Sequence, residues 1–208
     1  MTVMTRGARG PEAPLVVLLH GRGSSEADII GLADHLPAGP GYAAVRAPIA
    51  ENGGYAWFAN RGIGRPVAES LAATMGEFRQ WLDEYAPPSR PVVLVGFSGG
   101  AAFAGGLLLA DPDRWAGAAI LYGTLPFDAG VPVELGRLTG GHVLVAQGDA
   151  DTVIPRELLD RTWEYLRSES GAEVVAHRDA GGHGLTPDAL EVLATWVAER
   201  TGTSGGQP

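Results

Sequence analysis

The sequence contains no cysteine and no lysine, and each absence excludes a set of chemistries. Without cysteine the chain forms no disulfide, no thiolate metal site and no cysteine nucleophile. All 15 residues of the combined lysine and arginine count are arginines, which excludes Schiff-base chemistry, a Ser–Lys dyad and a P-loop lysine. We attribute the missing lysine to a biased genome composition, because alanine, glycine and arginine are abundant. The exclusions hold whatever the cause.

Positive charge is also scarce. The formal net charge of −9 argues against a nucleic-acid partner, because phosphates require a basic face, and against binding to an anionic membrane surface. Colloidal solubility is the simpler explanation of this acidity. The first apolar run, Leu15 to Leu19, is too short to span a bilayer or to export the chain. The sequence therefore predicts a soluble, cytoplasmic protein without membrane insertion.

The length of 208 residues suits one domain with a substantial core and is too short for two ordinary domains. We expect this domain to cover residues 1–200, followed by a flexible tail, residues 201–208, which is small and polar with Gly and Pro. Several apolar runs lack any polar alternation, as strands do when a parallel sheet is covered on both faces. The predicted strands are LVVLLH from Leu15, YAAVRAP from Tyr42, PVVLVGF from Pro91, AGAAILYG from Ala116, GHVLVAQG from Gly141 and AEVVAHR from Ala172.

Helix-length stretches separate these runs. From Pro66 to Tyr85 the apolar residues fall on one helical face, with Pro66 suited to the first turn. Pro155 to Arg167 and Pro187 to Arg200 repeat this pattern, and the segment from Ser98 to Ala110 is apolar with small residues, as in a helix packed tightly on a sheet. The alternation predicts a doubly wound α/β domain with a mostly parallel central sheet, helices on both faces and ligands at the carboxyl ends of the strands.

The candidate nucleophile is Ser98, in the sequence Gly96-Phe97-Ser98-Gly99-Gly100. A G-x-S-x-G pattern in a chain with 31 glycines is weak evidence by itself. Here it directly follows an apolar strand and opens an apolar helix, where a strained turn can expose a serine and small flanking residues let the turn close. The alternative is a glycine-rich turn with an incidental serine.

A serine nucleophile needs a base, and five histidines are available. Four lie within or beside predicted elements: His20, His35, His142 and His177. Only His183 lies in a glycine-rich loop between the last strand and the last helix, from which its ring can reach Ser98. A purely structural histidine is the alternative.

The acid that orients the base should lie between the serine and the histidine in chain order. Asp149 and Asp151 both follow a predicted strand, and their spacing does not choose between them. We expect the other aspartate to cap a turn or the next helix. A metal site made of these aspartates and His183 is disfavoured, since there is no helical histidine pair and no dense ligand cluster. We expect neither a metal nor an organic cofactor.

An oxyanion hole requires two backbone N–H donors, one from the residue after the nucleophile and one from the loop after an early strand. Gly99 supplies the first. The sequence Leu19-His20-Gly21-Arg22-Gly23 ends the first predicted strand, and we choose the backbone N–H of Arg22 as the second donor. The alternative is a tight turn held by His20.

Together, LLHGRGSS, GFSGG, QGDADTVIP and GGHGL resemble the phospholipase/carboxylesterase family of α/β hydrolases, which includes bacterial carboxylesterases and acyl-protein thioesterases. The resemblance spans roughly Leu15 to Arg200. It implies an α/β-hydrolase fold, and it implies Asp151 as the acid, because the family's acid stands directly before a stretch ending in Val/Ile-Pro. The family's loop donor matches Arg22, where thioesterase relatives usually have a neutral residue. The segment ENGGYAWF is similar to a smaller bacterial subgroup of hydrolases.

The predicted activity is hydrolysis of carboxylic esters through an acyl-enzyme on Ser98, with a small-molecule ester as the ligand. Acyl thioesterase or lysophospholipase activity is the alternative, and a non-catalytic binding protein with the same fold is the alternative from another class. A homodimer is left open as the assembly. About twenty residues separate the strands near Tyr122 and His142, too few for a helical lid domain.

The substrate pocket is expected under the aromatic segment between Pro48 and Arg65, where Tyr55, Trp57 and Phe58 could wall an acyl or alcohol group; the alternative is that they only pack the loop. An open site with Arg22 on one wall favours short to medium acyl chains.

Overall fold

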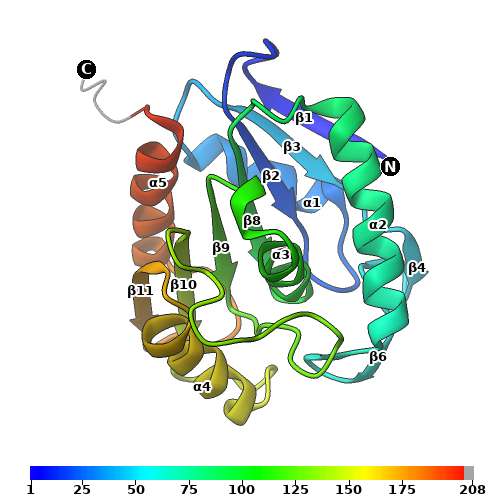
Figure 1. The fold of residues 1–208 in the computed structure, drawn as a ribbon, viewed down its shortest axis with the longest axis vertical. Helices are drawn as coiled ribbons and strands as arrows, with labels where there is room; N and C mark the ends of the chain where they lie inside the picture. Colours follow the sequence, from blue (N-terminus) through cyan, green and yellow to red (C-terminus); the bar gives the residue numbers. More distant parts are fainter. Residues whose placement is uncertain (204–208) are drawn as a thin grey trace.

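A seven-stranded sheet forms the centre of the computed structural model, which describes residues 1–203 (Figure 1). Six strands are parallel, and β1 pairs antiparallel with β3 at one edge. The order across the sheet is β1 (Val3–Gly7), β3 (Gly41–Val45), β2 (Leu15–Leu19), β8 (Val92–Phe97), β9 (Gly117–Leu121), β10 (His142–Gly148) and β11 (Glu173–Asp179). All six strands predicted from apolar runs are therefore present.

The strand β1 was not predicted, because its residues are mostly exposed and its two apolar residues, Val3 and Met4, do not belong to a longer apolar run. It lies at the sheet edge, where only one long side pairs with a neighbour. The central strands β2, β3 and β9 are buried along their whole length, which explains why apolar runs identified them.

Helices cover both faces of the sheet, and Figure 1 shows α3 in front of the central strands and α1 behind them. One buried cluster joins the sheet to α2 (Ala68–Tyr85), α3 (Gly99–Ala110) and α4 (Arg156–Glu164). A second cluster joins the opposite face to α1 (Glu26–Ile29), the following 3-10 helix η1 (Ile30–His35) and α5 (Pro187–Thr201). Shorter elements are the 3-10 turn η2 (Pro112–Arg114) and the π-helical turn η3 (Tyr165–Glu169), which continues α4.

Two small hairpins occupy the segment between β3 and α2. They are β4 (Ile49–Glu51) with β5 (Gly54–Ala56), and β6 (Asn60–Gly62) with β7 (Arg65–Pro66). The expectation that Pro66 begins a helix is wrong. Pro66 pairs with Asn60 in the second hairpin and Val67 caps α2, because the N–H of Val67 donates to the carbonyl of Ala59 and keeps the chain extended up to that point.

The last helix runs one residue past the expected end of the domain at residue 200, and the flexible tail stays a prediction. Thr201 is the last residue of α5, is buried, and donates its hydroxyl hydrogen to the carbonyl of Val197 at 2.7 Å. Residues 204–208 lie outside the described residues. The connection between β9 and β10 contains only turns and extended chain and forms no lid domain. Within residues 1–203, no helix is both long and apolar enough to cross a membrane.

Candidate active site

Ser98 lies at the turn between β8 and α3, with φ of 54° and ψ of −114°. A positive φ in a residue other than glycine typically costs about 1–3 kcal/mol, so the surrounding structure must enforce it. Gly96 and Gly100 allow the turn to close. A β-carbon on Gly96 would lie 2.2 Å from the carbonyl oxygen of Gly100, and one on Gly100 would lie 2.0 Å from that of Leu19. The turn therefore requires glycine at both positions.

Hydrogen bonds connect Ser98, His183 and Asp151 in a chain. The Oγ of Ser98 lies 2.9 Å from Nε2 of His183, and Nδ1 of His183 lies 2.8 Å from Oδ2 of Asp151. An ionised carboxylate only accepts hydrogen bonds, so Nδ1 carries the hydrogen and Nε2 is free to accept from the serine hydroxyl. This tautomer is the one that a general base needs.

The other oxygen of Asp151 holds the loop that carries it. Oδ1 accepts hydrogen bonds from the N–H groups of Val153 at 2.8 Å and Ile154 at 3.1 Å, and the side chain is fully buried. Asp149, by contrast, is exposed, and its backbone N–H donates to the carbonyl of Asp179. We expected the second aspartate to cap a turn. Instead Asp151 both caps the turn and contacts His183.

The backbone nitrogen of Arg22 lies beside Gly99, the residue that follows Ser98. A β-carbon on Gly99 would be 3.2 Å from the backbone nitrogen of Arg22. Neither N–H has a hydrogen-bond partner within residues 1–203. Two free N–H donors beside a serine hydroxyl are the arrangement that stabilises an oxyanion.

His20 is a structural residue, as the alternative interpretation of its turn proposed. Its ring is buried; Nε2 accepts from the N–H of Ala47 at 3.1 Å and Nδ1 donates to the carbonyl of Gly21 at 2.8 Å. Burial lowers the pKa of His20, which keeps the ring neutral and able to accept at Nε2. Trp57 donates its indole N–H to the carbonyl of His20 at 2.8 Å, so both sides of the turn are held.

The loop that carries His183 is anchored by Asp179, a residue that the sequence did not suggest. Its carboxylate accepts hydrogen bonds from the hydroxyl of Tyr122, from the N–H of Gly181 at 2.7 Å and from the hydroxyl of Thr186 at 3.2 Å. Burial acts to raise the pKa of Asp179, but these hydrogen bonds outweigh it and lower the pKa. Burial, together with the neighbouring Asp179, raises the pKa of Tyr122 to about 12.

A cavity of about 910 Å³ opens over Ser98 and is lined by Arg22, Gly99 and His183. Much of its lining is apolar and comes from Ile29, Leu32, Trp57, Phe58, Ile63, Val153, Ile154 and Leu185. A volume of this size accommodates a small organic ligand.

The three aromatic residues expected in the pocket have different positions. Trp57 and Phe58 line the cavity, and Trp57 also stacks on Phe103 with ring centroids 4.4 Å apart, so it belongs to wall and core alike. Tyr55 does not line the cavity, and its assignment to the pocket is wrong. Its backbone pairs with the loop at Ser24, and this pairing leaves its ring under the guanidinium of Arg46, 4.6 Å away.

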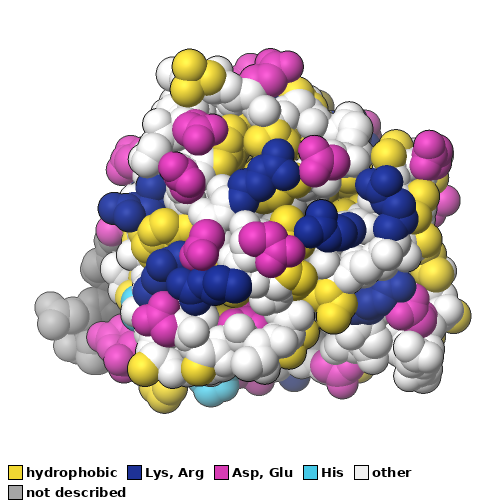
Figure 2. Space-filling view, turned by 90° about the horizontal axis from the view of Figure 1, so that it is seen from below, with side chains coloured by type: hydrophobic (Ala, Val, Ile, Leu, Met, Phe, Trp, Pro, Cys, Tyr) yellow, Lys and Arg dark blue, Asp and Glu magenta, His cyan; other side chains and the backbone are white. Residues whose placement is uncertain are grey.

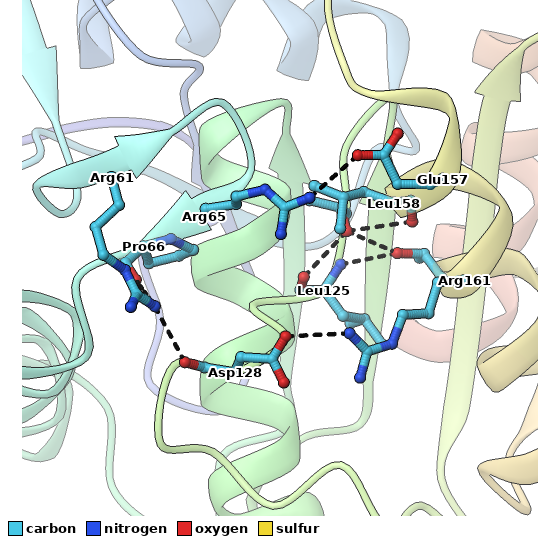
Figure 3. Close-up of polar contacts among 10 residues, drawn as sticks. Arg61, Arg65, Pro66, Leu125, Asp128, Glu157, Leu158 and Arg161 are labelled. Carbon is cyan, nitrogen blue, oxygen red and sulfur yellow. Dashed lines mark hydrogen bonds and ion pairs between the residues drawn. The ribbon is translucent and has the colours of Figure 1, made fainter.

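The β6–β7 hairpin carries Ile63 to the cavity, where the residue is 53% exposed. Figure 3 shows how this hairpin is fastened to its surroundings. Arg65 pairs with Glu157 of α4 at 3.1 Å, and Arg61 donates to the carbonyl of Asp128 at 3.3 Å. An isolated exposed ion pair contributes little to stability, so the pair of Arg65 with Glu157 adds little to the hold on this hairpin.

Figure 2 shows the molecule from below the view of Figure 1, the side toward which the arrows of β2 and β9 point. Basic and acidic side chains are interspersed there with apolar patches, and no charge of one sign dominates. No group of three or more His, Asp or Glu residues in the described part of the chain is arranged to hold a metal ion.

Comparisons with known proteins agree with this geometry. The sequence profile of the family described as Phospholipase/Carboxylesterase matches residues 3–199. A relative from Bacillus subtilis (strain 168), named "Putative hydrolase MhqD", is 28% identical over 195 residues, which cover 92% of this chain and 96% of that protein.

Solved structures show the same fold. The Bacillus cereus carboxylesterase has a TM-score of 0.83 and 25% identity, and the match covers 96% of this chain and 94% of that one. Acyl-protein thioesterase 2 of Zea mays has a TM-score of 0.77 and 21% identity, with 96% and 99% covered. The predicted α/β-hydrolase fold is confirmed.

Proposed function

Because this chain belongs to the phospholipase/carboxylesterase family, we propose that it cleaves carboxylic esters through an acyl-enzyme formed on Ser98. Membership of the family and its carboxylesterase neighbours make it a hydrolase of the carboxylesterase/thioesterase type. The observation that carries the proposal is the hydrogen-bonded chain from Ser98 through His183 to Asp151, with the serine hydroxyl facing an apolar cavity.

In the first step Nε2 of His183 takes the proton of Ser98 as the serine oxygen attacks the substrate carbonyl carbon. The negative charge that develops on the carbonyl oxygen is stabilised by the N–H groups of Gly99 and Arg22. Removing one such donor typically lowers kcat by about 10²- to 10³-fold. Asp151 stabilises the imidazolium that forms and keeps the ring in the required tautomer.

In the second step His183 gives its proton to the alcohol oxygen, and the alcohol leaves. Water then enters, His183 takes a proton from it, and the resulting hydroxide attacks the acyl carbon. Ser98 recovers its proton as the carboxylic acid is released.

We propose short to medium acyl chains as the preferred substrates. The cavity is open to solvent above Ser98, and the ion pair of Arg22 with Glu51 interrupts its apolar wall. A long acyl tail laid against this part of the wall would displace water from the charged pair.

A fluorophosphonate probe tests the proposal directly. The wild-type protein should be labelled on Ser98 and Ser98→Ala should not. The labelled enzyme should lose hydrolysis of p-nitrophenyl esters in proportion to labelling. Absence of labelling and of any ester, thioester or lysophospholipid hydrolysis would mean that the protein binds ligands without catalysis. Faster turnover of acyl-CoA or lysophospholipid than of matched esters would favour the thioesterase or lysophospholipase alternative.

A further inference from the structure

We propose that Glu51 is a positioning residue for the oxyanion hole and acts through the side chain of Arg22. The inference rests on the proposed function, since it concerns the N–H that would hold the substrate's oxyanion. Glu51 does not touch the reacting atoms. Its effect depends on how the loop Gly21–Ser24 is fixed above Ser98.

The backbone N–H and carbonyl of Arg22 do not hold this residue in place. Its N–H faces Gly99, and neither this N–H nor its carbonyl has a hydrogen-bond partner within residues 1–203. The flanking residues are both glycines, and Gly23 has a φ of 78°. Glycine restricts the backbone least, so the Arg22 peptide needs anchors from elsewhere.

One anchor acts on the preceding carbonyl. In a planar trans peptide the carbonyl of Gly21 and the N–H of Arg22 point in opposite directions. The carbonyl of Gly21 accepts hydrogen bonds from His20 Nδ1 at 2.8 Å and from the N–H of Ser24 at 3.2 Å. These bonds hold the Gly21 side of the peptide that carries the Arg22 N–H. They do not hold the Cα of Arg22, which needs a second contact.

The second anchor is the Arg22 side chain. Its Nε donates to Oε1 of Glu51 at 2.6 Å, its Nη2 donates to Oε2 of Glu51, and its Nη1 donates to the carbonyl of Phe58 at 2.9 Å. A bidentate arginine–carboxylate pair has a defined geometry as well as a favourable energy. Both side chains are partly buried, at 31% and 27% exposed, so water screens the pair less than an exposed one.

Glu51 is itself held in a paired hairpin. It pairs with Gly54 in the β4–β5 hairpin, and the same hairpin bonds to the loop through Tyr55, whose carbonyl accepts from Gly23 at 2.9 Å and whose N–H donates to Ser24 at 2.9 Å. The ion pair and the backbone bonds therefore join one hairpin to one loop, and they place the Arg22 N–H opposite that of Gly99.

The test compares Glu51→Gln, Arg22→Met and the double variant on p-nitrophenyl butyrate. Both single variants keep the Arg22 N–H but lose the ion pair. We expect each to lower kcat by about tenfold with little change in KM, and the double variant to be no worse than either single one. Affinity for a trifluoromethyl ketone inhibitor, whose hemiketal oxygen occupies the oxyanion hole, should fall by a similar factor. Glu51→Asp should recover part of the loss.

Asp160→Asn is the matched control, because Asp160 pairs with Arg156 and Arg178 on the surface away from the cavity. It should leave kcat unchanged. Wild-type kcat in Glu51→Gln, or a change in KM alone, would overturn the inference. A variant that melts at a lower temperature but has normal kcat would show a structural role only, which also overturns it. The proposed function fails separately, by absence of Ser98 labelling in the wild-type protein.

Discussion

The hydroxyl of Tyr122 donates a hydrogen bond to the carboxylate of Asp179, and so joins the chain just after β9 to the loop that carries His183. Tyr122 is fully buried and adopts a positive φ of 47°. Residues other than Ser98, His183 and Asp151 therefore help to hold the base in place. Removing their hydrogen bonds should lower both the free energy of unfolding and kcat.

Asp179→Asn should lower the free energy of unfolding at neutral pH by about 1–3 kcal/mol, because a partly buried, hydrogen-bonded carboxylate is replaced by a group that cannot accept the same bonds. The folded-state pKa of Asp179 is lowered, so its stabilisation is present above the unfolded pKa of about 4 and is lost as the pH falls through the folded value. The difference between wild type and variant should therefore shrink below about pH 4.

Urea denaturation between pH 7 and pH 3 measures this difference. Asp34→Asn, which changes an exposed carboxylate paired with Arg6, serves as the control and should stay close to wild type throughout. A difference for Asp179→Asn that stays constant with pH would contradict the assignment. Its kcat should fall several-fold, since the loop of His183 loses an anchor.

Ser98→Ala should lower kcat by roughly 10⁴-fold or more, because only binding and oxyanion stabilisation remain. The melting temperature should barely change, since alanine occupies the same turn. Steady-state kinetics with p-nitrophenyl acetate and a thermal melt check both statements. A tenth of the wild-type kcat in this variant would sink the assignment of the nucleophile.

Asp151→Asn should cost far more activity than Asp149→Asn, since only Asp151 contacts the imidazole. We expect a fall in kcat on the order of 10⁴-fold for Asp151→Asn and less than about threefold for Asp149→Asn. The two histidines are compared in the same way: we expect His183→Ala to be inactive and His177→Ala to remain active. The reverse order within either pair would show that the wrong residue was chosen.

Acyl-chain preference can be read from kcat/KM for p-nitrophenyl esters from acetyl to palmitoyl. We expect higher values from acetyl to hexanoyl than for dodecanoyl and longer chains, and no increase in rate at the critical micelle concentration, because no lid covers the site. A steady rise out to palmitoyl would reveal a deep apolar channel and would put the thioesterase alternative first.

Two glycine variants test the packing of the helices. A β-carbon on Gly105 of α3 would lie 2.5 Å from Leu125, whereas one on Gly76 of α2 would meet nothing within 4 Å. Gly105→Ala should destabilise the protein by about 1–3 kcal/mol through overpacking. Gly76→Ala should stabilise it by about 0.5–1 kcal/mol through lower backbone entropy in the unfolded chain. Equal melting temperatures would contradict this packing.

The sequence predicted the elements whose pattern is local. An apolar run suffices to mark a buried parallel strand, and the turn around Ser98 is visible because the sequence of strand, small residues and helix is contiguous. The edge strand β1 was missed because its residues are mostly exposed and only two of them, Val3 and Met4, are apolar, which gives no such pattern.

Side-chain partners distant in the chain could not be predicted. Glu51 is 29 positions from Arg22, and Asp179 is 57 positions from Tyr122. The local sequence around these residues contains no pattern that predicts either pairing. Tyr55 was misplaced for the same reason, since the cation beside its ring, Arg46, comes from outside its strand. Asp151 was resolved from Asp149 by family resemblance, because spacing alone treats the two aspartates alike.

Gly96 and Gly100, which lie two residues before and two residues after Ser98, have a consequence at the level of the gene. Every missense change in the codon of Gly96 or Gly100 adds at least one carbon where the nearest backbone oxygen is already 2.2 Å or less away. In a randomised library, clones altered at either codon should therefore be lost from an activity screen as completely as clones altered at the Ser98 codon, although neither glycine has a side chain to offer the substrate. Libraries intended to change substrate preference should leave these codons untouched and diversify the codons for the cavity rim, such as those of Ile63 and Val153.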